Sequence, residues 1–228
     1  MVVSFWISID VLSIISGSAQ DFKLVLDYLP AYLPQFTCFY NIMAGVSLGG
    51  HTAWRMASLA SDQLSGLAIV VGCPSLSSLL LSRLGIDATA LDTTSEELDG
   101  VSYEQLESVM NEQQRRRWPK PLAEIVREAD RKVSEEFPTQ IPVLLCNGVD
   151  DRLVPARYTA HWVGKRRIMR NGNRNVKKNE KPPSPVTLGE GEAEQEKVTF
   201  FVQENTGHSC TKEMVAMTAA WIGGIFEV

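Results

Sequence analysis

Four segments of the chain each contain a run of mostly apolar residues, and segments with helical spacing separate them. They cover residues 36–44 and 64–74, and, together with the loop that follows each run, residues 141–151 and 197–208. A strand without polar alternation is typical of a parallel sheet, where both faces of the strand are covered. Strands that alternate with helices are joined by right-handed crossovers. The pattern therefore predicts an α/β fold with a doubly wound, mostly parallel sheet.

Helical segments account for most of the remaining chain. Apolar residues at helical spacing predict a helix over residues 20–33, and residues 75–138 show helical patterns without a convincing strand. We interpret residues 75–138 as a helical insertion within one domain that spans residues 1–228. Residues 165–196 are basic first and acidic last, with prolines and glycines, and this composition predicts a disordered surface loop.

The first 20 residues allow two interpretations. A secretory signal could end at the small residues Gly17, Ser18 and Ala19, but no basic residue precedes the apolar stretch, and Asp10 interrupts it. We favour a buried strand followed by a loop. No apolar run reaches the roughly 18 residues that a membrane-spanning helix needs, so no stable membrane insertion is expected.

Composition and charge narrow the function classes. The 228 residues are 44% hydrophobic with a formal net charge of -5, which argues against nucleic-acid binding. None of the cysteines, Cys38, Cys73, Cys146 and Cys210, forms a C-x-x-C pair, which disfavours a zinc or thioredoxin-type site. We interpret them as reduced thiols and expect a cytoplasmic protein without metal or cofactor.

The stretch "GVSLGGH" places a serine between an apolar strand and a helix. A strand that ends in G-x-S-x-G and turns directly into a helix holds the serine above the sheet edge. Gly45 and Gly49 would avoid clashes with the neighbouring strand and helix, and the backbone N–H of Leu48 would face a developing oxyanion. Ser47 is therefore the candidate nucleophile, and the alternative is a Gly/Ser turn without chemistry.

A serine nucleophile needs a histidine base and an orienting carboxylate. His208 follows the fourth apolar run in a loop, which suits a mobile imidazole. His51 lies one turn into the helix after the serine and His161 lies within a helical segment, so both are poorer candidates. The loop after the third run offers Asp150 or Asp151 as the acid.

Taken together, "GVSLGGH", "GVDDRLVP" and "TGHS" resemble the α/β-hydrolase superfamily, most closely its esterase and prolyl-oligopeptidase-like members. The acid motif of that family, G-x-x-D-x-x-V-P, matches Gly148, Asp151, Val154 and Pro155. The resemblance thus favours Asp151 as the acid and implies a Ser47–His208–Asp151 triad. It also implies that residues 75–138 form a lid over the serine.

The resemblance implies further features of the lid and of the sheet. Four apolar residues of the insertion are candidates for an acyl pocket or for plain packing: Leu79, Leu80, Leu84 and Trp118. The family also has strands and an oxyanion loop ahead of the serine strand, where this chain has only the first 20 residues. We therefore expect N-terminal strands to be missing and assign no second oxyanion donor.

Two functions remain open from the sequence. The first is a serine hydrolase that cleaves a small acyl substrate, an ester, thioester or amide, through an acyl-enzyme. The second is an impaired or inactive α/β-hydrolase relative that acts as a binding or scaffold protein. The sequence leaves the oligomeric state open.

Overall fold

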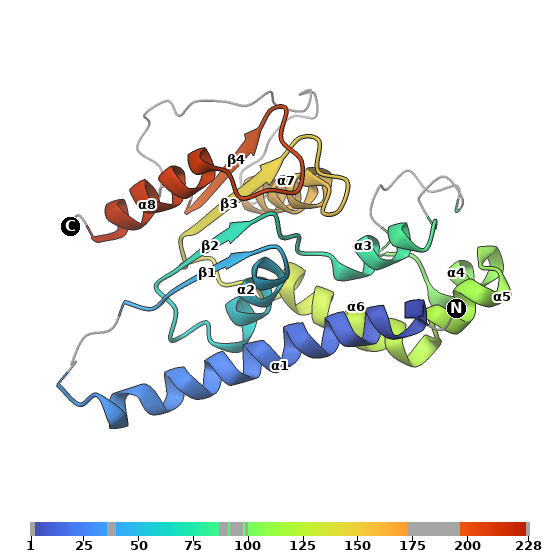
Figure 1. Ribbon diagram of the computed structural model, residues 1–228, viewed down its shortest axis with the longest axis horizontal. Helices are drawn as coiled ribbons and strands as arrows, with labels where there is room; N and C mark the ends of the chain where they lie inside the picture. The colour runs from blue at the N-terminus through green and yellow to red at the C-terminus, as the bar shows by residue number, and fades with distance from the viewer. Residues whose placement is uncertain are drawn as a thin grey trace.

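A parallel sheet forms the centre of the molecule. The computed structural model describes residues 3–35, 40–86, 91, 98, 100–172 and 197–226. Four strands pair in the order β1-β2-β3-β4, all parallel (Figure 1). Their bounds are β1 Ile42–Val46, β2 Gly66–Val70, β3 Val143–Gly148 and β4 Val198–Gln203. The sheet and its helices confirm the α/β fold class predicted from the sequence.

Helices cover both faces of the sheet, as a doubly wound arrangement requires. On one face, α2 (Leu48–Leu59), α6 (Lys120–Glu135) and α7 (Ala156–Gly172) bury Trp54, Val133 and Trp162 against Leu67 and Leu145 of the sheet. On the other face lies α8 (Lys212–Phe226). Its Met214 packs with strand side chains that point to this second face, including Ala68, Val70, Leu144 and Cys146.

The N-terminal segment is helical, so the strand expected within the first 20 residues is wrong. A single helix, α1, runs from Val3 to Tyr32 and lies along α2 (Figure 1). Its Ile15, Ala19 and Leu26 are spaced by four and seven residues and contact the core. Burial of that helical stripe outweighs the strand preference of the β-branched residues around it.

Strand β1 also differs from expectation, because it lies at the edge of the sheet. Burial on both faces was expected for residues 36–44, but the strand begins at Ile42, and Ala44 and Val46 are exposed. Residues 36–39, with Cys38, lie outside the described residues. Cys73 and Cys146 are buried, and Cys210 is exposed.

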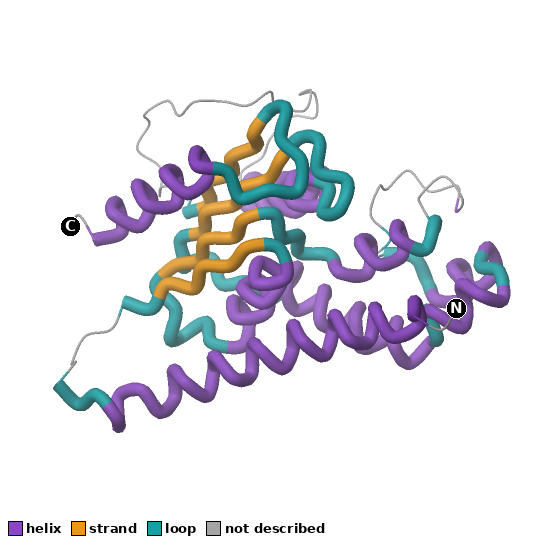
Figure 2. The backbone as a smooth tube through the Cα atoms, in the orientation of Figure 1, coloured by secondary structure: helices purple, strands orange, loops and turns teal. Residues whose placement is uncertain are grey.

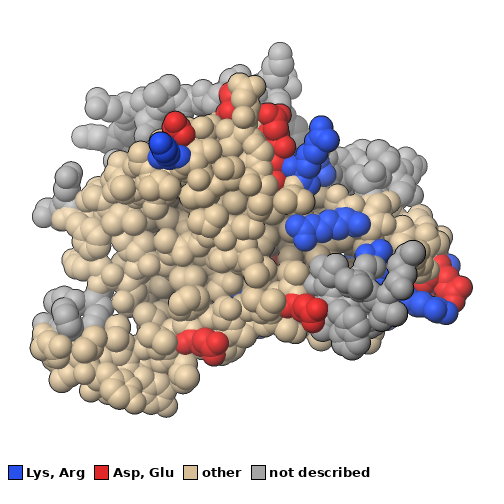
Figure 3. Space-filling model, in the orientation of Figure 1, with Lys and Arg blue, Asp and Glu red and all other residues tan. Residues whose placement is uncertain are grey.

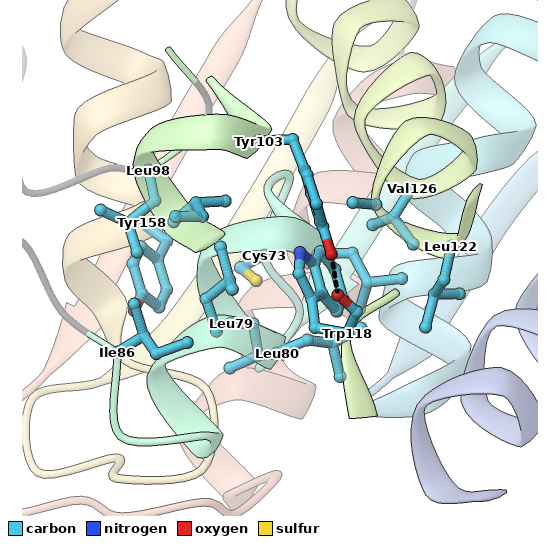
Figure 4. Packing of buried hydrophobic residues seen from close by; sticks show 14 of the residues in the cluster. Cys73, Leu79, Leu80, Ile86, Leu98, Tyr103, Trp118, Leu122, Val126 and Tyr158 are labelled. Atoms are coloured by element: carbon cyan, nitrogen blue, oxygen red, sulfur yellow. Dashed lines mark hydrogen bonds between the residues drawn. The ribbon is translucent and has the colours of Figure 1, made fainter. Parts of the chain in front are cut away.

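In its described residues, the insertion at residues 75–138 carries four helices. They are α3 (Leu76–Arg83), α4 (Tyr103–Val109), α5 (Glu112–Arg117) and α6. Leu79, Leu80 and Trp118 are at most 2% exposed and lie in one buried cluster with Tyr158 of α7 (Figure 4). Ile15 of α1 belongs to the same cluster. Leu84 packs partly buried against the same cluster. These four pocket candidates therefore take part in packing between the insertion and the rest of the domain.

Helix α7 continues into the segment for which a surface loop was expected. It ends at Gly172, so residues 165–172 are helical, and residues 173–196 lie outside the described part of the chain. Within the described residues, no helix is both long and apolar enough to cross a membrane.

Candidate active site

Ser47 lies at the sharp turn between β1 and α2. Its backbone has φ 54° and ψ −113°, a left-handed region that a serine rarely adopts. The Ser47 N–H donates to Val70 O at 2.9 Å, which ties the turn to the end of β2. A backbone strain of this kind costs about 1–3 kcal/mol and persists only where the surrounding structure enforces it.

Two glycines, Gly45 and Gly50, make this turn possible, whereas Gly45 and Gly49 were expected from the motif. A Cβ on Gly45 would lie 2.1 Å from Gly49 O, so no side chain fits there. A Cβ on Gly49 would meet nothing within 4 Å, and the expected steric role of Gly49 is therefore wrong. The close approach involves Gly50 instead, where a Cβ would lie 3.1 Å from the Cα of Gly72. The second glycine of the "GG" pair is the one that packs against the end of β2.

The structure brings Ser47, His208 and Asp151 together. Ser47 Oγ lies 2.7 Å from His208 Nε2, and His208 Nδ1 lies 2.8 Å from Asp151 Oδ2. The side chain of Asp151 is fully buried, whereas that of His208 is 20% exposed. A neutral imidazole that donates from Nδ1 to the carboxylate presents the Nε2 lone pair to the serine hydroxyl. The arrangement can thus accept a proton from Ser47.

The loop after β3 fixes the carboxylate of Asp151. Its Oδ1 accepts hydrogen bonds from the backbone N–H groups of Leu153 at 2.8 Å and Val154 at 2.9 Å. Oδ2 remains directed at His208. The neighbouring Asp150 is exposed, and its backbone N–H donates to Thr206 O at 2.9 Å. Of the two aspartates in the motif, Asp151 therefore contacts the imidazole.

Gly148 allows the histidine loop to approach β3 closely. A Cβ at this position would lie 2.2 Å from Thr206 O and 2.6 Å from Gly207 O. The loop between β4 and His208 therefore crosses directly over the end of β3. This contact brings two segments that are distant in sequence into hydrogen-bonding range, and it explains the glycine of the acid motif.

The N-terminus of α2 follows Ser47 directly. Leu48 is the first residue of this helix, and Ser47 makes no side-chain capping bond to it. The first N–H groups of a helix have no partner within the helix, and the helix dipole adds positive partial charge there. The Leu48 N–H is thus placed at the turn where the expected oxyanion would form.

His51 is buried and lies apart from the proton-transfer chain. It is 6% exposed, and its Nδ1 lies 3.1 Å from the backbone oxygen of Cys73. Burial lowers the pKa of His51 to about 4, so the ring is neutral at pH 7. His161 lies within α7, and the base contact of Ser47 Oγ is made by His208. Neither histidine takes the place of His208.

A buried ion pair behind the elbow was not found from the sequence. Arg55 of α2 donates to Asp130 of α6 at 3.1 Å, and both side chains are largely buried. Asp130 also accepts from the N–H groups of Leu76 at 3.1 Å and Ser77 at 2.7 Å, at the start of α3. An acidic residue 75 positions after an arginine gives no recognisable pattern. The pair joins the insertion to α2, the helix that follows Ser47.

The described residues show no side-chain arrangement typical of a metal site. Among the described residues, no group of three or more His, Cys, Asp or Glu side chains is arranged to hold a metal ion.

Comparisons with known proteins add structural neighbours. No family model matches the chain, and no curated protein matches its sequence. The chain is structurally similar to α/β-hydrolases. A monoacylglycerol lipase of Paleococcus ferrophilus has 16% identity and a TM-score of 0.45, with 92% of this chain and 74% of that chain covered.

Two further solved structures have similar sequence identities, TM-scores and coverage. Mouse α/β hydrolase domain-containing protein 10 has 13% identity and a TM-score of 0.43, with 89% of this chain and 68% of that chain covered. The α/β hydrolase MGS-MChE2, from a sediment metagenome of the Mar Chica lagoon, has 12% identity and a TM-score of 0.42. Here the match covers 87% of this chain and 68% of the other.

Proposed function

We propose that the protein is a serine hydrolase that cleaves carboxylic esters through an acyl-enzyme. One observation carries the proposal, namely the continuous contact from Asp151 through His208 to Ser47, at 2.8 Å and 2.7 Å. A serine that caps a helix for structural reasons alone needs no imidazole at its oxygen. The strained backbone of Ser47 further supports a functional role for this turn.

The proposed reaction starts at the serine hydroxyl. Ser47 Oγ attacks the ester carbonyl carbon while its proton passes to His208 Nε2, and the negative charge on the carbonyl oxygen is stabilised by the Leu48 N–H. The Asp151 carboxylate stabilises the resulting imidazolium. The tetrahedral intermediate then collapses, the bond to the alkoxy oxygen breaks, and His208 protonates the departing alcohol.

Deacylation repeats these steps with water. His208 Nε2 takes a proton from a water molecule, whose oxygen attacks the acyl carbon on Ser47. The second tetrahedral intermediate releases the carboxylic acid, and the proton returns to Ser47 Oγ. An ester is the preferred substrate class because an alcohol leaves more readily than an amine.

A second candidate function is a binding protein with little or no turnover. This candidate is favoured because the N–H of Leu48 is the one oxyanion donor that we assign within the described residues. Loss of one oxyanion donor typically lowers kcat by about 10²–10³. Such a protein would be stabilised by an acyl ligand without hydrolysing it.

The test is hydrolysis of p-nitrophenyl esters of increasing acyl length by the full chain. We expect a burst of nitrophenol, followed by slower turnover, and we expect both to disappear in Ser47→Ala. Ser58→Ala is the matched control, because Ser58 lies in the same helix and its hydroxyl donates to the backbone oxygen of Arg55. Turnover that survives in Ser47→Ala would contradict the mechanism, and a folded wild type without a burst would favour the second candidate.

A further inference from the structure

Arg83 connects the helical insertion to the loop that carries the triad acid. It is the last residue of α3, and its Nη2 donates to the backbone oxygen of Leu153 at 3.1 Å. The N–H of Leu153 in turn donates to Asp151 Oδ1 at 2.8 Å. A guanidinium has several N–H donors in one plane. In the described part of the chain, this is the one hydrogen bond that the Arg83 guanidinium makes, so its other donors can serve a ligand.

The charge of Arg83 also reaches the helix that follows Ser47. The pKa of His51, which burial lowers most, is lowered further by the positive charges of Arg83 and Arg55. His51 lies in the first turn of α2, so the Arg83 guanidinium lies near both the serine turn and the acid loop. Figure 2 shows the turn after β1 and the loop after β3 at the same end of the parallel sheet, on the side where α3 lies.

Two further exposed arginines lie in the same region. Arg152 follows Asp151 directly, and Arg157 lies at the start of α7, with its guanidinium 4.9 Å from the centroid of the Tyr158 ring. The hydroxyl of Tyr158 donates to the backbone oxygen of Ser78 in α3 at 3.3 Å, which brings the start of α7 against the insertion. Figure 3 shows Lys and Arg side chains exposed on this face of the molecule, between the loop after β3 and the helices of the insertion.

Carboxylates do not neutralise these three arginines, although the chain is acidic overall. Its formal net charge is -5, and elsewhere on the surface Arg116 of α5 pairs with Glu112 at 2.6 Å. Within the part of the chain that the structure describes, no carboxylate lies within ion-pair distance of Arg83, Arg152 or Arg157. An anion that arrives with a substrate would therefore meet guanidinium groups that have no competing partner.

We propose that the ester substrate carries a carboxylate and that Arg83 binds it. The planar guanidinium matches the two oxygens of a carboxylate, and one guanidinium balances its single charge. The bond to Leu153 holds the guanidinium in place, so esters of matching length bring their carbonyl carbon to Ser47. Arg152 and Arg157 raise the local positive potential and attract such anions. The inference rests on the proposed function and narrows its substrate class.

The test is the ratio of kcat/KM for charged and neutral esters of matched length, measured with the full chain. The mono-p-nitrophenyl esters of adipic, pimelic and suberic acid carry the carboxylate on the acyl side, and p-nitrophenyl hexanoate, heptanoate and octanoate are their neutral partners. On the alcohol side, para-acetoxybenzoate is compared with its methyl ester. We expect the wild type to favour the charged member of at least one pair by about 10-fold or more, since the arginine contact is a charge-assisted hydrogen bond.

Variants of Arg83 separate binding of the carboxylate from support of the acid loop. Arg83→Gln should abolish the preference for charged esters, and Arg83→Lys, which keeps the charge, should retain part of it. Arg116→Gln on α5 is the matched control and should leave the ratio unchanged.

Three outcomes would overturn the inference. An Arg83 that only holds the acid loop would lower kcat/KM for charged and neutral esters equally in Arg83→Gln. A wild type that hydrolyses neutral esters with a burst but shows no preference for any charged partner would overturn the inference and leave the proposed function intact. A folded wild type that hydrolyses none of the esters would contradict both.

Discussion

Ser47 Oγ and His208 Nε2 lie 2.7 Å apart although 161 positions separate the two residues in the chain. Two close backbone approaches produce this contact. Gly45 lets the start of α2 turn tightly against β1, and Gly148 lets the histidine loop cross the end of β3.

The two neighbouring aspartates should differ sharply in their effect on activity. In Asp151→Asn, the amide would favour the wrong imidazole tautomer, and we expect kcat for ester hydrolysis to fall about 10⁴-fold. Asp150→Asn is the matched control, because this exposed side chain makes no bond to His208 in the structure. The comparison is made by steady-state kinetics, and equal losses in both variants would refute the assignment of the acid.

The glycines of the serine motif should tolerate alanine unequally. Gly45→Ala would force a Cβ to 2.1 Å from Gly49 O, so we expect misfolding or loss of both stability and activity. Gly49→Ala meets open space at the start of a helix, where alanine is favoured, and should keep wild-type stability. Thermal unfolding and ester turnover of the purified variants provide the comparison, and the account fails if Gly45→Ala is as stable and active as Gly49→Ala.

The buried pair between Arg55 and Asp130 should matter for stability. Asp130→Ala leaves the Arg55 guanidinium buried without its partner and removes the acceptor for the Leu76 and Ser77 N–H groups. We expect the free energy of unfolding in urea to fall by about 3–5 kcal/mol. Glu135→Ala, which breaks an exposed contact to Arg131 on the same helix, should leave the midpoint almost unchanged. Similar losses of unfolding free energy in the two variants would contradict a stabilising role of the buried pair.

His51 should make the protein less stable in mild acid. Burial lowers its folded pKa to about 4 from 6.5, so below pH 6.5 the unfolded chain binds a proton that the folded chain does not. Stability therefore falls as the pH drops from 6.5 towards 4, and this residue alone contributes a loss of about 2 kcal/mol between pH 7.5 and pH 5.

A variant without an ionisable group at this position isolates the effect. His51→Asn can still donate to the Cys73 backbone oxygen but stays neutral, so its unfolding free energy should depend less on pH over this interval. Urea unfolding at pH 7.5, 6 and 5 measures both proteins. Parallel pH profiles for wild type and His51→Asn would contradict the burial of a neutral imidazole.

The strands and the helices that follow them could be predicted because their pattern is local. Apolar runs such as that in β3 and the G-x-S-x-G turn are visible in a few consecutive residues. The expected chain order of serine, acid and histidine then pointed to the three side chains that the structure brings together. Which aspartate contacts the imidazole followed from the family resemblance, since Asp150 and Asp151 are equivalent by composition.

The remaining features depend on packing between distant segments. The first 20 residues contain β-branched runs that favour a strand, yet contacts of Ile15 and Ala19 with the rest of the domain make them helical. The exposure of β1 depends on its place in the sheet, and the requirement for Gly50 rather than Gly49 depends on the position of Gly72. None of these relationships can be read from a single stretch of sequence.

If His208 activates Ser47, the mass of the intact protein after exposure to a fluorophosphonate should report it. We expect one adduct per chain on the wild type, mapped to Ser47, no adduct on Ser47→Ala, and strongly slowed labelling of His208→Ala. A folded wild type that takes up no probe, or labelling of Ser47→Ala at the wild-type rate, would contradict it.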